Sequence, residues 1–193
     1  DTQLPFEQMV DEYCELIELQ VAAVDGFIAE TIPSIAEAKG VLTAAAQADT
    51  RIVLGLTVSD DNGLLLRSGE SLSDTLEAIA PWAPLAVVIN CSKPEAVSQA
   101  LPVLAESGWP FGAYANGFTA IDALEPGGVV DVLEARNDLN PDQYALFVAQ
   151  WLDLGATIIG GCCEVGPAHI AAMHRLVSDR GLNSAGWKTL TSE

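Results

Sequence analysis

Residues 157–180, TIIGGCCEVGPAHIAAMHRLVSDR, contain the pattern that decides the fold. A short β-branched run ends at two glycines, and a stretch with helical spacing of its apolar residues follows. We expect a strand at 157–161 and a helix at 166–180, which together make one β-then-α unit. Two adjacent cysteines, Cys162 and Cys163, lie between them, directly after the expected strand.

The chain begins with an amphipathic helix that runs from Phe6 to Val24. Between this helix and residue 157, the same strand-then-helix unit occurs four more times. The other expected strands are 26–30, 51–58, 85–90 and 110–115, and the other expected helices are 34–48, 71–80, 93–107 and 140–154. Strands that are apolar throughout are typical of a parallel sheet covered on both faces. The regular alternation therefore predicts an α/β fold, either doubly wound or a barrel. We expect Pro102 to kink or split its helix, and a long loop over 116–138 to cross the top of the sheet.

The composition limits the class of protein. The 193 residues are 50% hydrophobic, enough for a single domain over 1–193 with a sizeable core. With 27 acidic and 8 basic residues the formal net charge is -19, which would repel nucleic acids and anionic membrane surfaces and favour cationic small molecules. The first residues lack the pattern of a signal peptide, and no apolar run approaches the roughly 18 residues of a membrane helix. We therefore expect a cytoplasmic protein with reduced thiols.

Side chains suited to chemistry gather at the carboxyl ends of the expected strands. In barrels and in open α/β sheets alike, this edge carries the active site. Such residues could instead have been scattered over the helices, so their common position indicates a functional site. The residues at these ends are Glu30, Asn90, Cys91, Tyr114, Asn116, Cys162 and Cys163.

Three of these side chains are thiols, and three thiolates suit zinc with a fourth coordination position left open for chemistry. Adjacent residues within a strand point to opposite faces, but Gly160 and Gly161 free the backbone to aim Cys162 and Cys163 the same way. Buried cysteines also serve as small hydrophobes, and for the pair alone both interpretations stand equally. Cys91 at another strand end favours the metal.

Other candidate residues have simpler explanations. We interpret Cys14 as a core residue of the first helix, and Asp60 and Asp61 as part of a solvated turn. His169 and His174 lie five residues apart on the last helix, outside the i, i+4 spacing of a metal pair, and we interpret both as surface or packing residues. A redox role for the adjacent cysteines is disfavoured, because their disulfide would close a strained ring and leave Cys91 unexplained.

Several motifs, in this order, resemble the homocysteine S-methyltransferase family, which includes betaine–homocysteine methyltransferase, S-methylmethionine-dependent enzymes and the homocysteine module of methionine synthase. The resemblance spans roughly residues 5–180. The motifs are DGFIAETIPSIAEAK (25–39), INCSKPEAV (89–97), YANG (114–117) and GGCC (160–163), the last followed by a proline and HIAAM (169–173).

This resemblance implies a (β/α)8 barrel in which Cys91, Cys162 and Cys163 bind zinc and Glu30 holds the amino group of homocysteine. Asn90 and Tyr114 lie in matching motifs and are candidate substrate-binding residues. A free thiol of pKa about 8.5 is mostly protonated at neutral pH, and coordination to zinc removes that proton. The implied reaction moves a methyl group from a cationic donor, namely S-methylmethionine, S-adenosylmethionine or betaine, to homocysteine and gives methionine.

Two features depart from the family pattern. The family motif usually continues GGCCGT, whereas this chain has GGCCEVG, with Glu164 beside the cysteines. The chain also has five expected strands where a (β/α)8 barrel has eight, and the family's first strand, with its Asp-Gly-Gly element, has no counterpart. We therefore expect the C-terminal five βα units of the barrel, completed by an N-terminal segment or another chain. A non-catalytic zinc-binding half-barrel, acting as an assembly or regulatory partner, is the alternative function.

Overall fold

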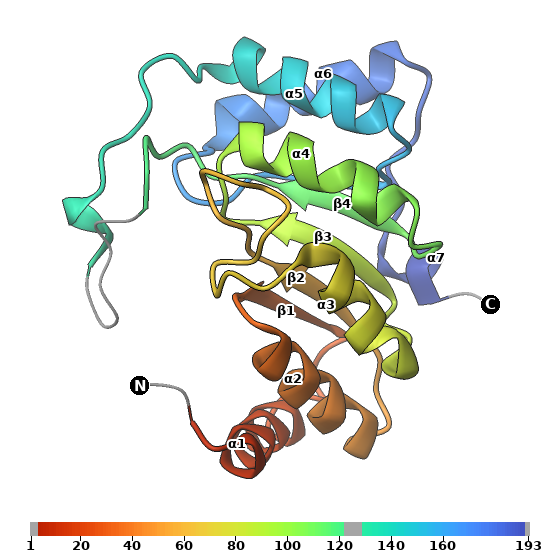
Figure 1. Cartoon of the computed structure of the whole chain (residues 1–193). Helices are drawn as coiled ribbons and strands as arrows, with labels where there is room; N and C mark the ends of the chain where they lie inside the picture. The colour runs from red at the N-terminus through yellow and green to blue at the C-terminus, as the bar shows by residue number, and fades with distance from the viewer. Residues whose placement is uncertain (1–3, 122–128, 192–193) are drawn as a thin grey trace.

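Five parallel strands form one sheet whose strand order follows the chain, β1-β2-β3-β4-β5 (Figure 1). The computed structural model describes residues 4–121 and 129–191. β1 and β5 lie at the two edges of the sheet. The strands are β1 (Phe27–Ile32), β2 (Ile52–Leu56), β3 (Ala86–Asn90), β4 (Phe111–Tyr114) and β5 (Ile158–Ile159).

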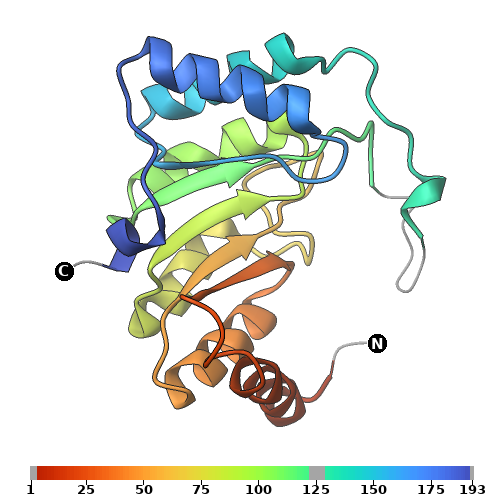
Figure 2. The same ribbon diagram turned by 180° about the vertical axis from the view of Figure 1, so that it is seen from behind.

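The crossover helices all lie on one face of this sheet, and a short C-terminal helix lies on the other (Figures 1 and 2). Sequential strands with helices on a single face form a barrel-type α/β unit, whereas a doubly wound sheet carries helices on both faces. The helices are α1 (Phe6–Glu18), α2 (Ile35–Gln47), α3 (Leu72–Ile79), α4 (Pro94–Ala105), α5 (Pro141–Asp153), α6 (Pro167–Asp179) and α7 (Trp187–Thr191), with 3-10 turns η1 (Ala80–Trp82) and η2 (Val130–Val132).

Capping side chains fix where several helices begin. The hydroxyl of Ser34 accepts a hydrogen bond from the Glu37 N–H at the start of α2. Asn140 Oδ1 accepts two, from the backbone N–H groups of Asp142 and Gln143, at the start of α5. Each bond satisfies a backbone donor that the first helical turn leaves without a partner.

Some boundaries differ from the expected ones. α1 ends at Glu18 rather than near Val24, and β5 has only two residues. α4 runs without interruption through Pro102, so the expectation of a split helix is wrong. Pro102 is exposed, so its ring lies on the solvent side of α4, away from the sheet. α7 was not expected, and part of the loop expected over 116–138 lies outside the described residues.

The main core lies between the sheet and the helices. Large side chains that are completely buried there include Leu54, Ile89, Leu101, Tyr144 and Trp151. Burying such side chains contributes about 1.5–3 kcal/mol each, so this layer supplies most of the stability of the unit. Among the helices of the described residues, none combines the length and apolar character needed to cross a membrane.

The opposite face of the sheet, which would face the interior of a barrel, is packed differently. Val53 of β2 and Val88 of β3 form a small second cluster there, against which Trp187 and Leu190 of the α7 region pack. A Cβ on Gly26 would overlap the ring of Trp187, so this glycine makes room for the indole. β1 at the edge is less covered, and Ile28 is half exposed. The expectation that the strands are covered on both faces therefore holds for β2 and β3 but not for β1.

Candidate metal centre

The thiols of Cys91, Cys162 and Cys163 meet at the carboxyl edge of the sheet, with their three Sγ atoms all within 4.8 Å of one another. The Sγ atoms of the adjacent pair are 3.8 Å apart. All three side chains are partly buried, and none is in a disulfide. A cluster of soft thiols in a partly enclosed position has the donor chemistry of a zinc site with one position open to a substrate.

Backbone hydrogen bonds to the loop after β4 hold the cysteine pair in place. The Cys162 N–H donates to the Ala115 carbonyl at 3.0 Å, and the Gly117 N–H donates to the Cys163 carbonyl at 2.9 Å. A Cβ on Gly161 would overlap the side chain of Val165, so the turn that follows β5 needs glycine there. The two glycines before the cysteines therefore permit the tight turn that the sequence predicts.

Cys91 takes a left-handed backbone conformation, with φ of 50°. This conformation is uncommon outside glycine and asparagine, and it persists at functional sites where surrounding contacts over-determine it. The Cys91 N–H donates to the Tyr114 carbonyl at 3.3 Å, which continues the β3–β4 pairing one residue past the strand. The turn at Cys91 directs its thiol toward the cysteine pair across the sheet edge.

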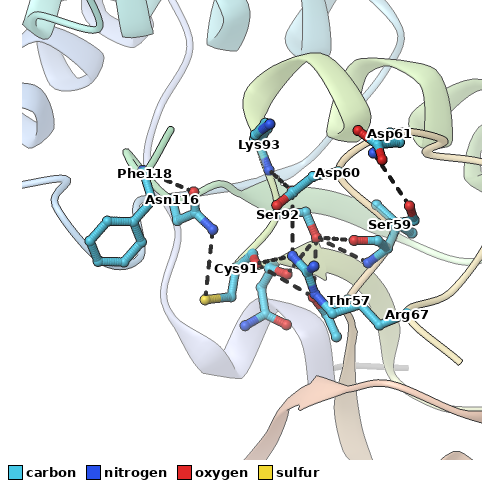
Figure 3. A network of polar contacts seen from close by, with 12 residues as sticks. Thr57, Ser59, Asp60, Asp61, Arg67, Cys91, Ser92, Lys93, Asn116 and Phe118 are labelled. Atoms are coloured by element: carbon cyan, nitrogen blue, oxygen red, sulfur yellow. Dashed lines mark hydrogen bonds and ion pairs between the residues drawn. The ribbon is translucent and has the colours of Figure 1, made fainter. Parts of the chain in front are cut away.

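A polar network behind Cys91 holds its carbonyl group (Figure 3). Arg67 Nη2 donates to the Cys91 carbonyl at 3.1 Å, and Arg67 Nε donates to Thr57 Oγ1 at 3.0 Å. Ser92, which is completely buried, accepts from the Val58 N–H and shares a hydrogen bond with Thr57. A non-glycine residue with positive φ is thus fixed by several hydrogen bonds at once.

Asp60 belongs to this network, which corrects its interpretation as a solvated turn residue. Its side chain is only 2% exposed and pairs with Arg67 at 3.3 Å. Asp60 also accepts a hydrogen bond from the Lys93 N–H at 2.9 Å. Asp61 is exposed, as expected. Sequence reasoning missed Arg67, Thr57 and Ser92 as well, because nothing in their spacing shows that a loop returns to β3.

The thiols influence one another's protonation. The interaction with Cys162 lowers the pKa of Cys91, and the same interaction raises the pKa of Cys162 well above its ordinary value. Burial, together with the charge of Cys162, raises the pKa of Cys163. Thiols this close cannot all ionise without a cation, because like charges at short range oppose each other. A divalent cation would remove that conflict, so the cluster fits the metal on electrostatic grounds too.

The candidate substrate residues Glu30 and Tyr114 come from β1 and β4, which are separated by β2 and β3 in the sheet. Glu30 is exposed and lies two residues before the end of β1, which runs past the expected strand 26–30, and Tyr114 is partly buried at the end of β4. The pKa of Tyr114 is raised by burial and then by the charge of Glu30 and a side-chain interaction with that carboxylate, so the two groups are close enough to influence each other. The Tyr114 hydroxyl is buried without a hydrogen-bond partner among the described residues. A polar substrate group between these two side chains would satisfy it.

Gly55 makes room for this arrangement. A Cβ at Gly55 would lie 2.8 Å from Asn90 Oδ1 and 3.1 Å from the Tyr114 hydroxyl. Asn90 is completely buried and hydrogen-bonds to Thr31. A side chain on β2 would therefore fill the space between the candidate substrate residues.

The remaining candidates lie around the cluster. Asn116 is buried, and its Nδ2 lies 4.0 Å from Cys91 Sγ. Glu164 is exposed in a left-handed turn, with φ of 65°, outside the thiol cluster. His169 hydrogen-bonds to the Gly166 N–H and to the Leu139 carbonyl, a packing role as interpreted from the sequence. Cys14 contacts Gln47 on α2, far from the other thiols along the chain.

This chain is similar to known proteins in sequence and in fold. The family described as homocysteine S-methyltransferase matches residues 1–177. Homocysteine S-methyltransferase 2 of Arabidopsis thaliana is 30% identical over 85% of this chain and 50% of its own length. Betaine-homocysteine S-methyltransferase of Drosophila melanogaster is 28% identical over 86% of this chain and 51% of its own. The chain thus spans about half the length of the curated relatives it matches.

A solved structure supports the fold. The apo form of the homocysteine methyltransferase MmuM from Escherichia coli superposes with a TM-score of 0.70 at 24% identity, over 90% of this chain and 59% of that one. The fold is therefore that of five βα units of a TIM-type (β/α)8 barrel, with the thiol cluster at the edge where such barrels carry their active sites. Within that class, the chain belongs to the homocysteine S-methyltransferase family.

Proposed function

We propose that this protein is a zinc-dependent methyltransferase that moves a methyl group from a cationic donor to homocysteine and gives methionine. The observation that carries this proposal is the convergence of three Sγ atoms within 4.8 Å at the active-site edge of a barrel of this family. Cys91, Cys162 and Cys163 would hold the zinc. When bound, zinc lowers the pKa of a coordinated thiol, so that a thiol substrate can react as the thiolate at neutral pH.

The residues around the thiols would bind and orient the amino-acid part of the substrate. Glu30 carries a carboxylate at the open edge of the site, suited to an ammonium group. The unpartnered Tyr114 hydroxyl offers a hydrogen bond to the same substrate. Once the substrate sulfur is ionised, methyl transfer needs no general base from the protein, so the task of these side chains is orientation.

The methyl donor would be S-methylmethionine, S-adenosylmethionine or betaine, each of which carries its methyl group on a cationic sulfur or nitrogen. The net charge of -19 favours a cationic ligand. The relatives are named for different substrates, betaine with homocysteine in one and selenocysteine in another. The clustered thiols must stay reduced to bind metal, which favours a cytoplasmic setting.

The barrel would be completed by strands beyond those described here, from an N-terminal segment or from another chain, so that residues 1–193 act as one part of a homocysteine-binding domain. β1 and β5 are edge strands of the five-stranded sheet. Edge strands with unpaired backbone groups are templates for further pairing. In a closed barrel each of them would pair with one of the added strands.

The experiment combines metal analysis with a methylation assay. The purified protein is loaded with zinc, and methionine formation from homocysteine is measured with each of the three donors. We expect about one zinc per closed barrel, and Cys91→Ala should lose most of the zinc and the activity with it. Cys14→Ala is the matched control, because it removes a thiol that contacts Gln47 rather than the cluster. Unchanged zinc content in Cys91→Ala would contradict the site.

The alternative is a non-catalytic zinc-binding half-barrel that assembles with or regulates a partner. The observation in its favour is that the chain spans about half the length of its relatives. The same assay separates the two functions when it is run on this chain alone and on the chain combined with an Asp-Gly-Gly-bearing first strand. Zinc binding without methionine formation in either form would support the alternative.

A further inference from the structure

The side chain of Asn90 is completely buried, and both the oxygen and the nitrogen of its amide form hydrogen bonds with a single residue, Thr31. Asn90 Oδ1 accepts from the Thr31 N–H at 2.9 Å, and Asn90 Nδ2 donates to Thr31 Oγ1 at 2.8 Å. The two residues are on different strands, β3 and β1, with β2 between them. The amide therefore reaches across the inner face of the sheet, over Gly55, which leaves the space for it.

Thr31 is in a β-bulge. Ala29 pairs with Leu54 and Ile32 pairs with Leu56, so two residues of β1, Glu30 and Thr31, oppose the single residue Gly55 of β2. A bulge of this kind next to an active site re-aims a side chain. In this bulge the side chain concerned is that of Glu30, the residue before Thr31.

The bulge is strained and needs support. Thr31 has a φ of 62°, and a β-branched residue in the left-handed region is an outlier. Such a conformation persists only where its surroundings over-determine it. The two hydrogen bonds from Asn90 satisfy the backbone donor and the hydroxyl of Thr31 together.

We propose that Asn90 is a positioning residue that acts through Thr31 to aim Glu30 at the ammonium group of the thiol substrate. The inference rests on the proposed function and extends it, since it gives Asn90 a task other than direct substrate contact. Asn90 directly precedes Cys91 in the chain. One short segment thus sets both the thiol that would hold the metal and, across the sheet, the carboxylate that would hold the substrate.

The test is a comparison of two thiols that differ only in the ammonium group, homocysteine and 4-mercaptobutyrate. Their dissociation constants are measured by calorimetry on the zinc-loaded, full-length protein, and the ratio gives the preference for the ammonium group. We expect Asn90→Ala to reduce this preference about tenfold or more, the scale of one charge-assisted hydrogen bond. The affinity for 4-mercaptobutyrate and the zinc content should stay unchanged.

Two variants of Thr31 test the same inference without changing the buried Asn90. Thr31 is exposed, so we expect both variants to fold. Thr31→Val removes the hydroxyl that accepts from Asn90 Nδ2 and should reduce the preference in the same direction. Thr31→Ser keeps that hydroxyl and should retain the preference.

The possible outcomes separate this inference from the proposed function. An unmodified protein that binds no homocysteine would overturn the proposed function, and this inference with it. Homocysteine binding with an unchanged preference in Asn90→Ala and Thr31→Val would overturn the positioning role alone. Equal weakening of both thiols, or loss of zinc in Asn90→Ala, would likewise overturn it, because Asn90 would then act on the fold or on the metal cluster.

Discussion

The two faces of the sheet are packed differently, and two neighbouring residues of β2 show the difference. Leu54 faces the helices, where it is completely buried in the main core. Gly55 faces the other way, where the absence of a side chain leaves room for Asn90 and Tyr114. The helix-covered face is filled to gain stability, whereas the inner face keeps space at its carboxyl end for polar side chains. Stability and function are thus assigned to opposite faces of the same strands.

The largest expected effect concerns the helix-covered face. Leu54→Ala should lower the free energy of unfolding by about 2–5 kcal/mol, because it removes buried methyl groups and leaves a cavity. Urea denaturation followed by circular dichroism measures this loss. Zinc content and homocysteine affinity of the folded protein should not change, and a loss of affinity would show that the two faces are not independent.

On the inner face, Glu30→Gln should weaken homocysteine binding by about 1.5–3 kcal/mol, the contribution of a charged hydrogen bond. Stability should hardly change, because Glu30 is exposed. Calorimetric titration with homocysteine, alongside a zinc assay, checks this expectation. If the variant lost zinc instead, Glu30 would belong to the metal centre rather than to the substrate site.

Gly55→Ala sharpens the comparison, since it adds one methyl group to the inner face, one residue from Leu54. The new Cβ would lie 2.8 Å from Asn90 Oδ1 and 3.0 Å from the Ala29 carbonyl, so Asn90 has to move. We expect a stability cost of about 1–3 kcal/mol from overpacking, and weaker homocysteine binding with zinc retained. Binding equal to that of the unmodified protein would show that the space over Gly55 is not used.

The smallest expected effect is at Tyr144, whose ring packs in the main core and whose hydroxyl contacts the backbone at the ends of β4 and β5. Tyr144 belongs to α5 and its side chain is completely buried, and its hydroxyl accepts from the Ala115 N–H at 3.0 Å and donates to the Gly160 carbonyl at 2.9 Å. Tyr144→Phe should cost about 1–2 kcal/mol of stability, because it removes both hydrogen bonds and leaves the buried Ala115 N–H without its partner. Thermal unfolding measures it, and a matching loss of zinc would reveal that this hydroxyl also supports the turn that carries the cysteine pair.

The sequence predicted most of the helix-covered face, because periodicity is a local signal. The apolar runs placed all five strands, and the three thiols expected at strand ends come together at one edge of the sheet. The motif order carried the family resemblance, which the match over residues 1–177 confirms. These features depend on residues that are close together in the chain.

The supports of the site could not be predicted in the same way. Asp60 was assigned to a solvated turn because short-range patterns do not show that Arg67 folds back onto the Cys91 carbonyl. The bulge at Thr31 depends on an amide from Asn90, 59 residues further along the chain. Pro102 predicts a kinked or split helix, whereas α4 continues through it with the proline exposed, and that position is a property of tertiary packing. Long-range contacts decide each of these cases.

The packing of Trp187 against Gly26 has a consequence for the order of folding. The ring lies on residues contributed by several strands, so its binding surface exists only after those strands have aligned. The contact also joins opposite ends of the described chain, and closing so long a loop is entropically costly. We expect the indole to dock last during refolding. In stopped-flow experiments, the fluorescence change that is absent from Trp187→Phe should therefore lag behind the recovery of helical circular dichroism.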